Sequence, residues 1–76
     1  MDEKRMLKIV EQFSRDNSPA EAEITVTRVP DHKTVFVETV GEAGRAIIMT
    51  EYRVDGKTYW AGYSTRSQTV YISMAA

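Results

Sequence analysis

The sequence has 76 residues, of which 42% are hydrophobic and 28% charged, with a formal net charge of −1 and no cysteine. This composition is typical of a globular protein and excludes disordered and collagen-like chains, while the missing thiols exclude disulfides and thiolate metal sites. The near-zero charge provides no field to attract a polyanion. Since the first residues mix both charges and contain no long apolar run, we expect no membrane segment and a single cytoplasmic domain over residues 1–76.

The first segment has the spacing of an amphipathic helix. Its apolar residues fall at positions i, i+3, i+4 and i+7 and form one stripe: Met6, Ile9, Val10 and Phe13. Asp2 suits the helix N-terminus, and residues 17–19, which include a proline, would end the helix. The pattern predicts a helix over residues 3–15 that buries one face.

The next two segments have the features of strands. In the segment 21–29, residues 22–27 alternate between apolar and polar side chains, which is typical of a strand with one face in water. A turn over residues 30–33, rich in turn-forming side chains, should let residues 34–40 return antiparallel beside the first strand. We expect Val35 and Val37 to point inward, because two β-branched residues suit a helix-covered core.

The stretch from Arg45 to Tyr63 predicts a β-hairpin around Asp55 and Gly56. A type I′ turn needs positive φ at both central residues, and Asp-Gly satisfies this requirement. Counting outward from this turn places three tyrosines on the helix side of the sheet, namely Tyr52, Tyr59 and Tyr63. The opposite face then carries Glu51, Arg53 and Trp60, with Met49 beside Gly62 and with Ile47 further along.

The remaining segments complete the expected fold. The glycines of residues 41–44 indicate a plain hairpin turn, since a phosphate loop would be longer and would open a helix. Residues 70–74 alternate as a last strand. The sequence therefore predicts an α+β fold with an N-terminal helix packed on one face of a curled antiparallel meander of about five strands.

Catalytic chemistry has few candidates in this sequence. His32 is the only histidine and falls in the expected turn, and no serine lies in a Gly-x-Ser-x-Gly elbow. Glu38 would lie on the face of Trp60, where a carboxylate beside the indole could have a raised pKa and act as an acid or base. Glu51 would lie there too and is more simply paired with an arginine or solvated. We therefore expect no enzyme, no bound metal and no cofactor.

The three tyrosines on the helix side suggest two interpretations. They could line a small-molecule pocket between helix and sheet. Alternatively, their rings fill the margin of the core while each hydroxyl group reaches water. The second interpretation is favoured, and we expect no small-molecule ligand.

The face opposite the helix is the predicted binding site. We expect no other part of the chain to cover its apolar side chains, and Gly62 leaves a flat place where a foreign backbone could approach. We therefore expect a small protein-binding module that forms a homodimer or caps another protein, in the manner of inhibitors, antitoxins and phage-encoded antagonists. The residues of this predicted site are Phe36, Ile47, Met49, Arg53, Trp60 and Tyr71.

Single-stranded nucleic acid is the alternative partner for the same face. Its aromatic rings could stack on bases, with Arg45, Arg53 and Arg66 as phosphate contacts. Glutamates would share this face, and a chain without net positive charge gains little from counterion release. We therefore expect protein binding rather than nucleic acid binding.

Overall fold

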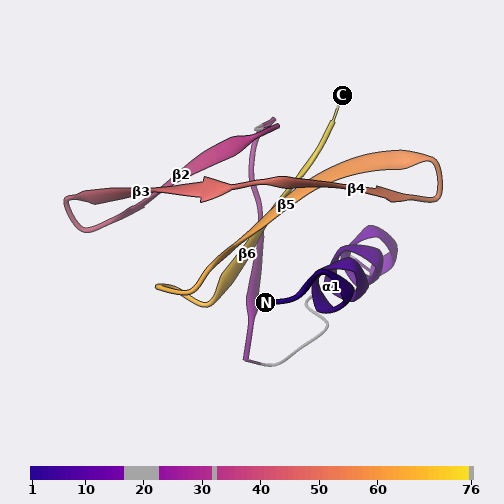
Figure 1. The fold of residues 1–76 in the computed structure, drawn as a ribbon, viewed down its shortest axis with the longest axis horizontal. Helices are drawn as coiled ribbons and strands as arrows, with labels where there is room; N and C mark the ends of the chain where they lie inside the picture. Colours follow the sequence, from indigo (N-terminus) through magenta and orange to yellow (C-terminus); the bar gives the residue numbers. More distant parts are fainter. Residues whose placement is uncertain (17–22, 32, 76) are drawn as a thin grey trace.

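The computed structural model describes residues 1–16, 23–31 and 33–75, whose arrangement is shown in Figure 1. The described part contains one N-terminal helix and six strands, which confirms the α+β class. The strand expected over residues 45–54 is divided at Met49, so there is one strand more than predicted. In chain order the elements are α1 (Glu3–Asp16), β1 (Thr25–Arg28), β2 (Val35–Val40), β3 (Ala43–Ile48), β4 (Thr50–Val54), β5 (Lys57–Ser64) and β6 (Thr69–Met74).

Helix α1 begins after Asp2, whose carboxylate accepts a hydrogen bond of 2.8 Å from the backbone N–H of Arg5. This N-cap satisfies one of the N–H groups that have no partner in the first helical turn. The predicted helix over residues 3–15 is confirmed and extends to Asp16. Its apolar stripe faces the sheet with four buried side chains: Met6, Ile9, Val10 and Phe13.

The main sheet has four strands in the order β1-β6-β5-β4. Strands β4 and β5 are joined by Asp55 and Gly56, which have φ values of 51° and 77°, as a type I′ turn requires. In the antiparallel ladder, Tyr52 lies opposite Tyr59. The ladder begins with Val54 opposite Lys57 and ends with Thr50 opposite Ala61. The predicted register of this hairpin is therefore confirmed.

Strand β1 pairs in parallel with β6, from Thr25 opposite Thr69 to Arg28 opposite Ile72. The backbone N–H of Val29 continues this contact with a 2.9 Å hydrogen bond to the carbonyl of Ile72. The prediction that residues 34–40 return beside residues 21–29 is therefore wrong. The predicted antiparallel meander, in which each strand pairs with the next, is wrong for the same reason. After β1 the chain instead leaves this sheet, and β1 pairs with the edge of β6.

Strands β2 and β3 form a separate antiparallel hairpin, here called the β2–β3 hairpin. Its turn consists of Gly41, which has a φ of 63°, and Glu42, so the predicted turn in this region is confirmed but is shorter than expected. The hairpin packs on the sheet face opposite α1, because Ile47 of β3 shares a cluster with residues of β5 and β6. In Figure 1 it extends away from the helix, and β3 runs on almost in line with β4.

The inward and outward residues of β2 are the reverse of the prediction. Val35 and Val37 are 41% and 58% exposed, whereas Phe36 is half-buried and Glu38 is buried. The ring of Phe36 lies 4.6 Å from that of Tyr71, between centroids. The burial of the Phe36 ring and the hydrogen-bonded carboxylate of Glu38 therefore determine which side of β2 faces the sheet. The β-branched shape of the two valines does not.

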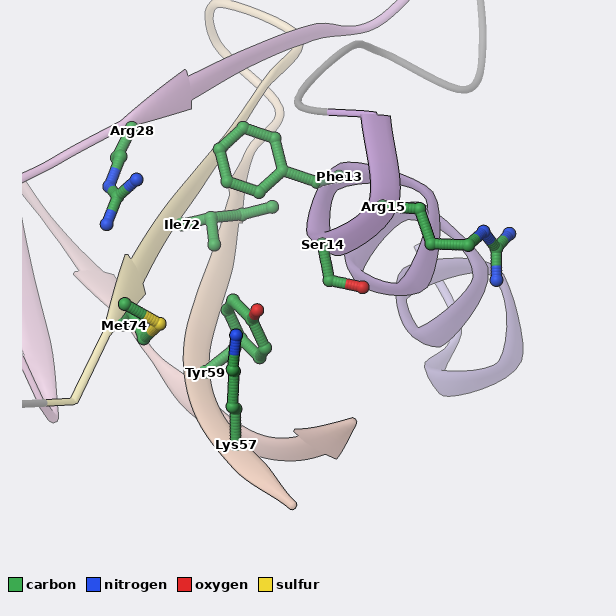
Figure 2. A pocket seen from close by; sticks show the side chains of 8 residues that line it. All are labelled: Phe13, Ser14, Arg15, Arg28, Lys57, Tyr59, Ile72 and Met74. Carbon is green, nitrogen blue, oxygen red and sulfur yellow. The ribbon is translucent and has the colours of Figure 1, made fainter. Parts of the chain in front are cut away.

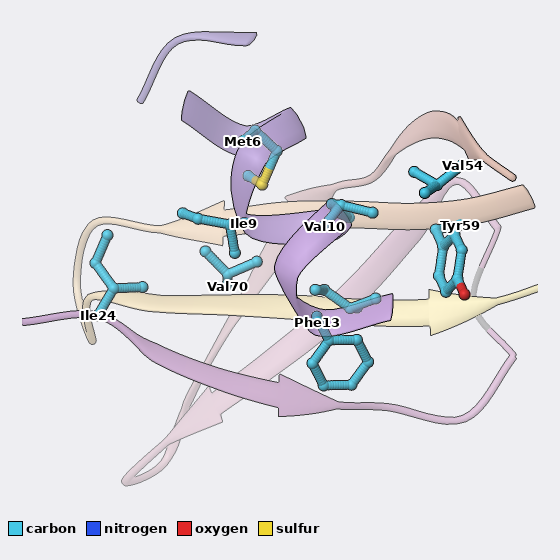
Figure 3. Close-up of a cluster of buried hydrophobic side chains, with 10 residues drawn as sticks. Met6, Ile9, Val10, Phe13, Ile24, Val54, Tyr59 and Val70 are labelled. Carbon is cyan, nitrogen blue, oxygen red and sulfur yellow. The ribbon is translucent and has the colours of Figure 1, made fainter. Parts of the chain in front are cut away.

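The larger hydrophobic core lies between α1 and the four-stranded sheet (Figure 3). Side chains from the helix point onto Val70 and its neighbours, and Val10, Val70 and Ile72 have no measurable exposure. Tyr59 is buried at the edge of this core, while Tyr52 and Tyr63 pack against it half-buried. The predicted packing of the three tyrosine rings at the margin of the core is therefore confirmed.

Candidate protein-binding surface

The five apolar residues predicted to form an open binding face do gather in one cluster. Ile47 and Met49 are buried, and the three aromatic rings are half-buried. The β2–β3 hairpin itself covers this side of the sheet, so the expectation of an uncovered face is wrong. Arg53 is exposed on β4 and is not part of the cluster. The cluster consists of Val29, Phe36, Ile47, Met49, Trp60 and Tyr71.

Gly62 of β5 allows the hairpin to approach the sheet closely. A Cβ atom added there would lie 2.7 Å from the carbonyl oxygen of Ile48 and 2.8 Å from the sulfur of Met49. Both distances are shorter than real Cβ contacts, and the carbonyl belongs to the backbone. The flat place predicted beside Met49 therefore exists, and the backbone that occupies it is the protein's own β3.

A buried carboxylate fixes the hairpin to the turn between β5 and β6. Glu38 is only 3% exposed, and its Oε1 accepts hydrogen bonds from Ser64 Oγ at 2.7 Å and from the Arg66 guanidinium at 3.1 Å. Its Oε2 accepts from Ser67 Oγ at 2.5 Å and from the hydroxyl group of Tyr71. Arg66 also donates to the backbone carbonyl of Glu38 at 3.1 Å. All of these donors satisfy one anion at the centre of the contact.

These hydrogen bonds determine the protonation of the network. The hydroxyl groups of Ser64, Ser67 and Tyr71 lower the pKa of Glu38 to about 2, with a smaller contribution from Arg66 and against the effect of burial. Burial and the bond to Glu38 raise the pKa of Tyr71. The expectation that the pKa of Glu38 is raised is therefore wrong. At neutral pH this carboxylate stays ionised and is a very weak base, so the network serves to hold the hairpin in place.

The outer side of the hairpin carries exposed apolar side chains. Ile48 is 71% exposed and lies opposite Val35 in the ladder, and Val37 lies opposite Ala46, which is also exposed. We call these four residues the hairpin patch. The largest apolar patch of a monomer is frequently functional. The sequence analysis missed this patch because it placed the valines inward; the two-residue turn after Val40 would have indicated the register with Ile48.

The outer edge of β2 has no neighbouring strand among the described residues. The backbone N–H of Met49 donates to the carbonyl of Thr34 at 2.8 Å, and hydrogen-bonded pairs alternate along an antiparallel ladder. The backbone groups of Val35, Val37 and Thr39 therefore point toward the open edge. Such an edge can accept another strand.

The residues proposed for nucleic acid contact are dispersed. Arg66 is held by Glu38, whereas Arg45 is exposed on β3 and Arg53 on β4. The rings that would stack on bases instead pack beneath the hairpin. His32 lies outside the described residues. Within the described ranges, no three acidic, histidine or cysteine side chains gather as metal ligands, and no helix is long and apolar enough to cross a membrane.

The chain was compared with models of protein families, with curated proteins and with solved structures, and none of these comparisons gave a match.

Proposed function

We propose that this protein is a non-enzymatic protein-binding module, and that its contact surface is the hairpin patch. The observation that supports this proposal most directly is the exposure of Ile48, which at 71% is the most exposed of the large apolar side chains in the described part of the chain. Val35 and Val37 lie beside it on the same side of the hairpin. Burial of such side chains is favourable by roughly 25 cal/mol per Å².

The first partner that we expect is a second copy of the protein, packed face to face about a twofold axis. Every copy carries the same patch, and a twofold interface needs only one self-complementary surface. Only apolar and uncharged side chains lie in the patch, so no like charges meet when two copies pack together. Four side chains supply less than the roughly 800 Å² per partner of a stable interface. We therefore expect a weak dimer with a dissociation constant in the micromolar range.

Nucleic acid binding is less well supported than protein binding. The net charge is −1, and the hairpin patch contains no lysine or arginine. Contacts to phosphate groups provide most of the non-specific affinity for nucleic acid. We expect at most weak binding of a single-stranded oligonucleotide, with a steep loss of affinity as salt is added.

The proposal is tested by measuring molar mass by light scattering up to high micromolar concentration. Ile48→Lys should convert the dimer to a monomer, because it places a charge at the centre of the contact. Leu7→Lys is the matched control, since Leu7 is also an exposed apolar residue at 38% but lies on α1. We expect this control to remain a dimer.

A third variant, Thr39→Pro, separates contact through the patch from contact through the open edge of β2. Proline removes an N–H group that points toward this edge and leaves the patch intact. The proposal predicts that the dimer persists in this variant. A dimer that survives Ile48→Lys but is lost in Thr39→Pro would place the interface on the edge, and a monomeric wild type would exclude the second copy as the partner.

A further inference from the structure

A cavity of about 260 Å³ lies between the C-terminal part of α1 and the four-stranded sheet (Figure 2). Its deeper lining is apolar: Phe13 from the helix, and Tyr59 and Ile72 from β5 and β6, are all buried. Met74, the last residue of β6, is 39% exposed and lies at the opening. The cavity thus combines buried apolar side chains with access from solvent.

Cationic side chains surround this opening. Arg28 and Lys57 extend from the sheet side, on either side of Met74 in Figure 2. Arg15 also lines the cavity, but its guanidinium group points away from it. No described lining residue is acidic, and none of these three cations forms an ion pair with a residue in the described ranges.

The local charge differs in sign from the charge of the whole chain, which is −1. Two cations that have no ion-pair partner among the described residues, beside buried apolar side chains, create a local potential that attracts an anion. An arginine guanidinium can form two parallel hydrogen bonds with a carboxylate, and a lysine adds a point charge. The chemistry of the opening is therefore complementary to a carboxylate group attached to an apolar body.

We propose that this cavity binds a small apolar carboxylate, with the carboxylate at Arg28 and Lys57 and the apolar body against Phe13 and Tyr59. Pockets for drug-sized ligands have volumes of about 300–1,000 Å³. The smaller volume here suits a short alkyl chain or a single ring. Such a ligand departs from the sequence-based expectation that no small molecule binds.

The cavity and the hairpin patch are independent of each other. The cavity belongs to the helix side of the sheet, where Phe13, Tyr59 and Ile72 are part of the larger core. The hairpin patch lies on the outer side of the layer that covers the opposite face. Variants of the cavity should therefore leave the oligomeric state unchanged, and Ile48→Lys should leave ligand binding unchanged.

The test is a titration of the protein with octanoate, followed by nuclear magnetic resonance of the Met74 and Ile72 methyl groups and by calorimetry. Octylamine, which has the same chain length and the opposite charge, is the matched probe. We expect saturable binding of octanoate with one site per chain and at least tenfold weaker binding of octylamine, since hydrogen bonds to charged groups carry this much discrimination.

Arg28→Gln and Lys57→Gln should each weaken octanoate binding about three- to tenfold, because each removes one exposed charge from the opening. Both residues are exposed, so these variants should keep the circular dichroism spectrum of the wild type. Arg53→Gln is the matched control, as it removes an exposed arginine of β4 that does not line the cavity. Met74→Trp should block the opening and abolish binding.

Several outcomes would overturn the proposal. Equal affinity for octanoate and octylamine would show that the two cations do not select the ligand. Equal weakening by Arg53→Gln and Arg28→Gln would show that only the overall charge matters. Failure of octanoate to shift the Met74 and Ile72 signals would exclude this cavity as the site.

Discussion

The two faces of the four-stranded sheet are covered by elements that are held in different ways. Helix α1 covers one face with four buried apolar side chains. The β2–β3 hairpin covers the other with a smaller apolar cluster, a close backbone approach at Gly62 and the hydrogen bonds of Glu38. Apolar burial is not directional, whereas hydrogen bonds and close packing require fixed positions. We therefore expect the hairpin to respond to small local changes and the helix to respond only to loss of core volume.

The largest effect is expected from Ile9→Ala on the helix side. Ile9 is 1% exposed within the larger core, and truncation of such a residue costs about 2–5 kcal/mol of the free energy of unfolding. Urea denaturation followed by circular dichroism and by Trp60 fluorescence should give one shared, earlier transition. Leu7→Ala, at a helix position that is 38% exposed, is the control. A similar loss of stability in both variants would contradict the assigned core.

A smaller and more local effect is expected from Gly62→Ala on the hairpin side. The added methyl group would collide with the backbone of β3, and such overpacking costs about 1–3 kcal/mol. Hydrogen exchange should accelerate in β2 and β3, while the amides of α1 keep their protection. Gly44→Ala is the control, because a Cβ atom added at Gly44 would lie 3.4 Å from the nearest atom, Cγ1 of Val37, which is an ordinary contact distance. Uniform loss of protection across the whole chain would show that the two covers are not independent.

The smallest effect is expected from mild acid, just below pH 4.5, through the carboxylate that holds the hairpin. The pKa of Glu38 is lowered from 4.5 to about 2 in the folded protein, so the unfolded chain binds the proton more readily between these values. The stabilisation from this carboxylate is therefore complete above about pH 4.5 and decreases as the pH falls toward 2.

Glu38→Gln should remove this part of the acid dependence, as measured by urea denaturation over a series of pH values. Glu51→Gln, which removes an exposed carboxylate of β4, is the matched control for the loss of one negative charge. We expect Glu51→Gln to retain the acid dependence of the wild type. An unchanged profile in Glu38→Gln would mean that the network does not hold the hairpin.

Local patterns in the sequence were sufficient for the helix and for the β4–β5 hairpin. The apolar stripe ending at Phe13 has the helical period, and the turn at Asp55 and Gly56 determines which side chains oppose each other. The same counting correctly separated Tyr59 from Trp60 onto different faces. These predictions succeeded because each depends on residues that are close together in the chain.

The predictions that failed depend on contacts between distant parts of the chain. Strand β2 has apolar residues on both sides, so its alternation could not indicate which side faces the sheet. The partners of Glu38 come from residues 64–71, and no local pattern connects them to β2. No local pattern indicates what covers Trp60 either. The sequence predicted that another molecule covers it, whereas the protein's own β2–β3 hairpin does so.

The parallel pairing of Thr25 with Thr69 requires that β1 wait for β6 while the chain is being synthesised. The β4–β5 hairpin closes around two residues and can form within microseconds, whereas the closure of β1 onto β6 spans most of the chain and carries a larger entropic cost. We therefore expect β1 to dock late. Until it does, the edge of β6 is open to the β1 strand of a neighbouring chain. Refolding at high protein concentration should therefore favour domain-swapped species.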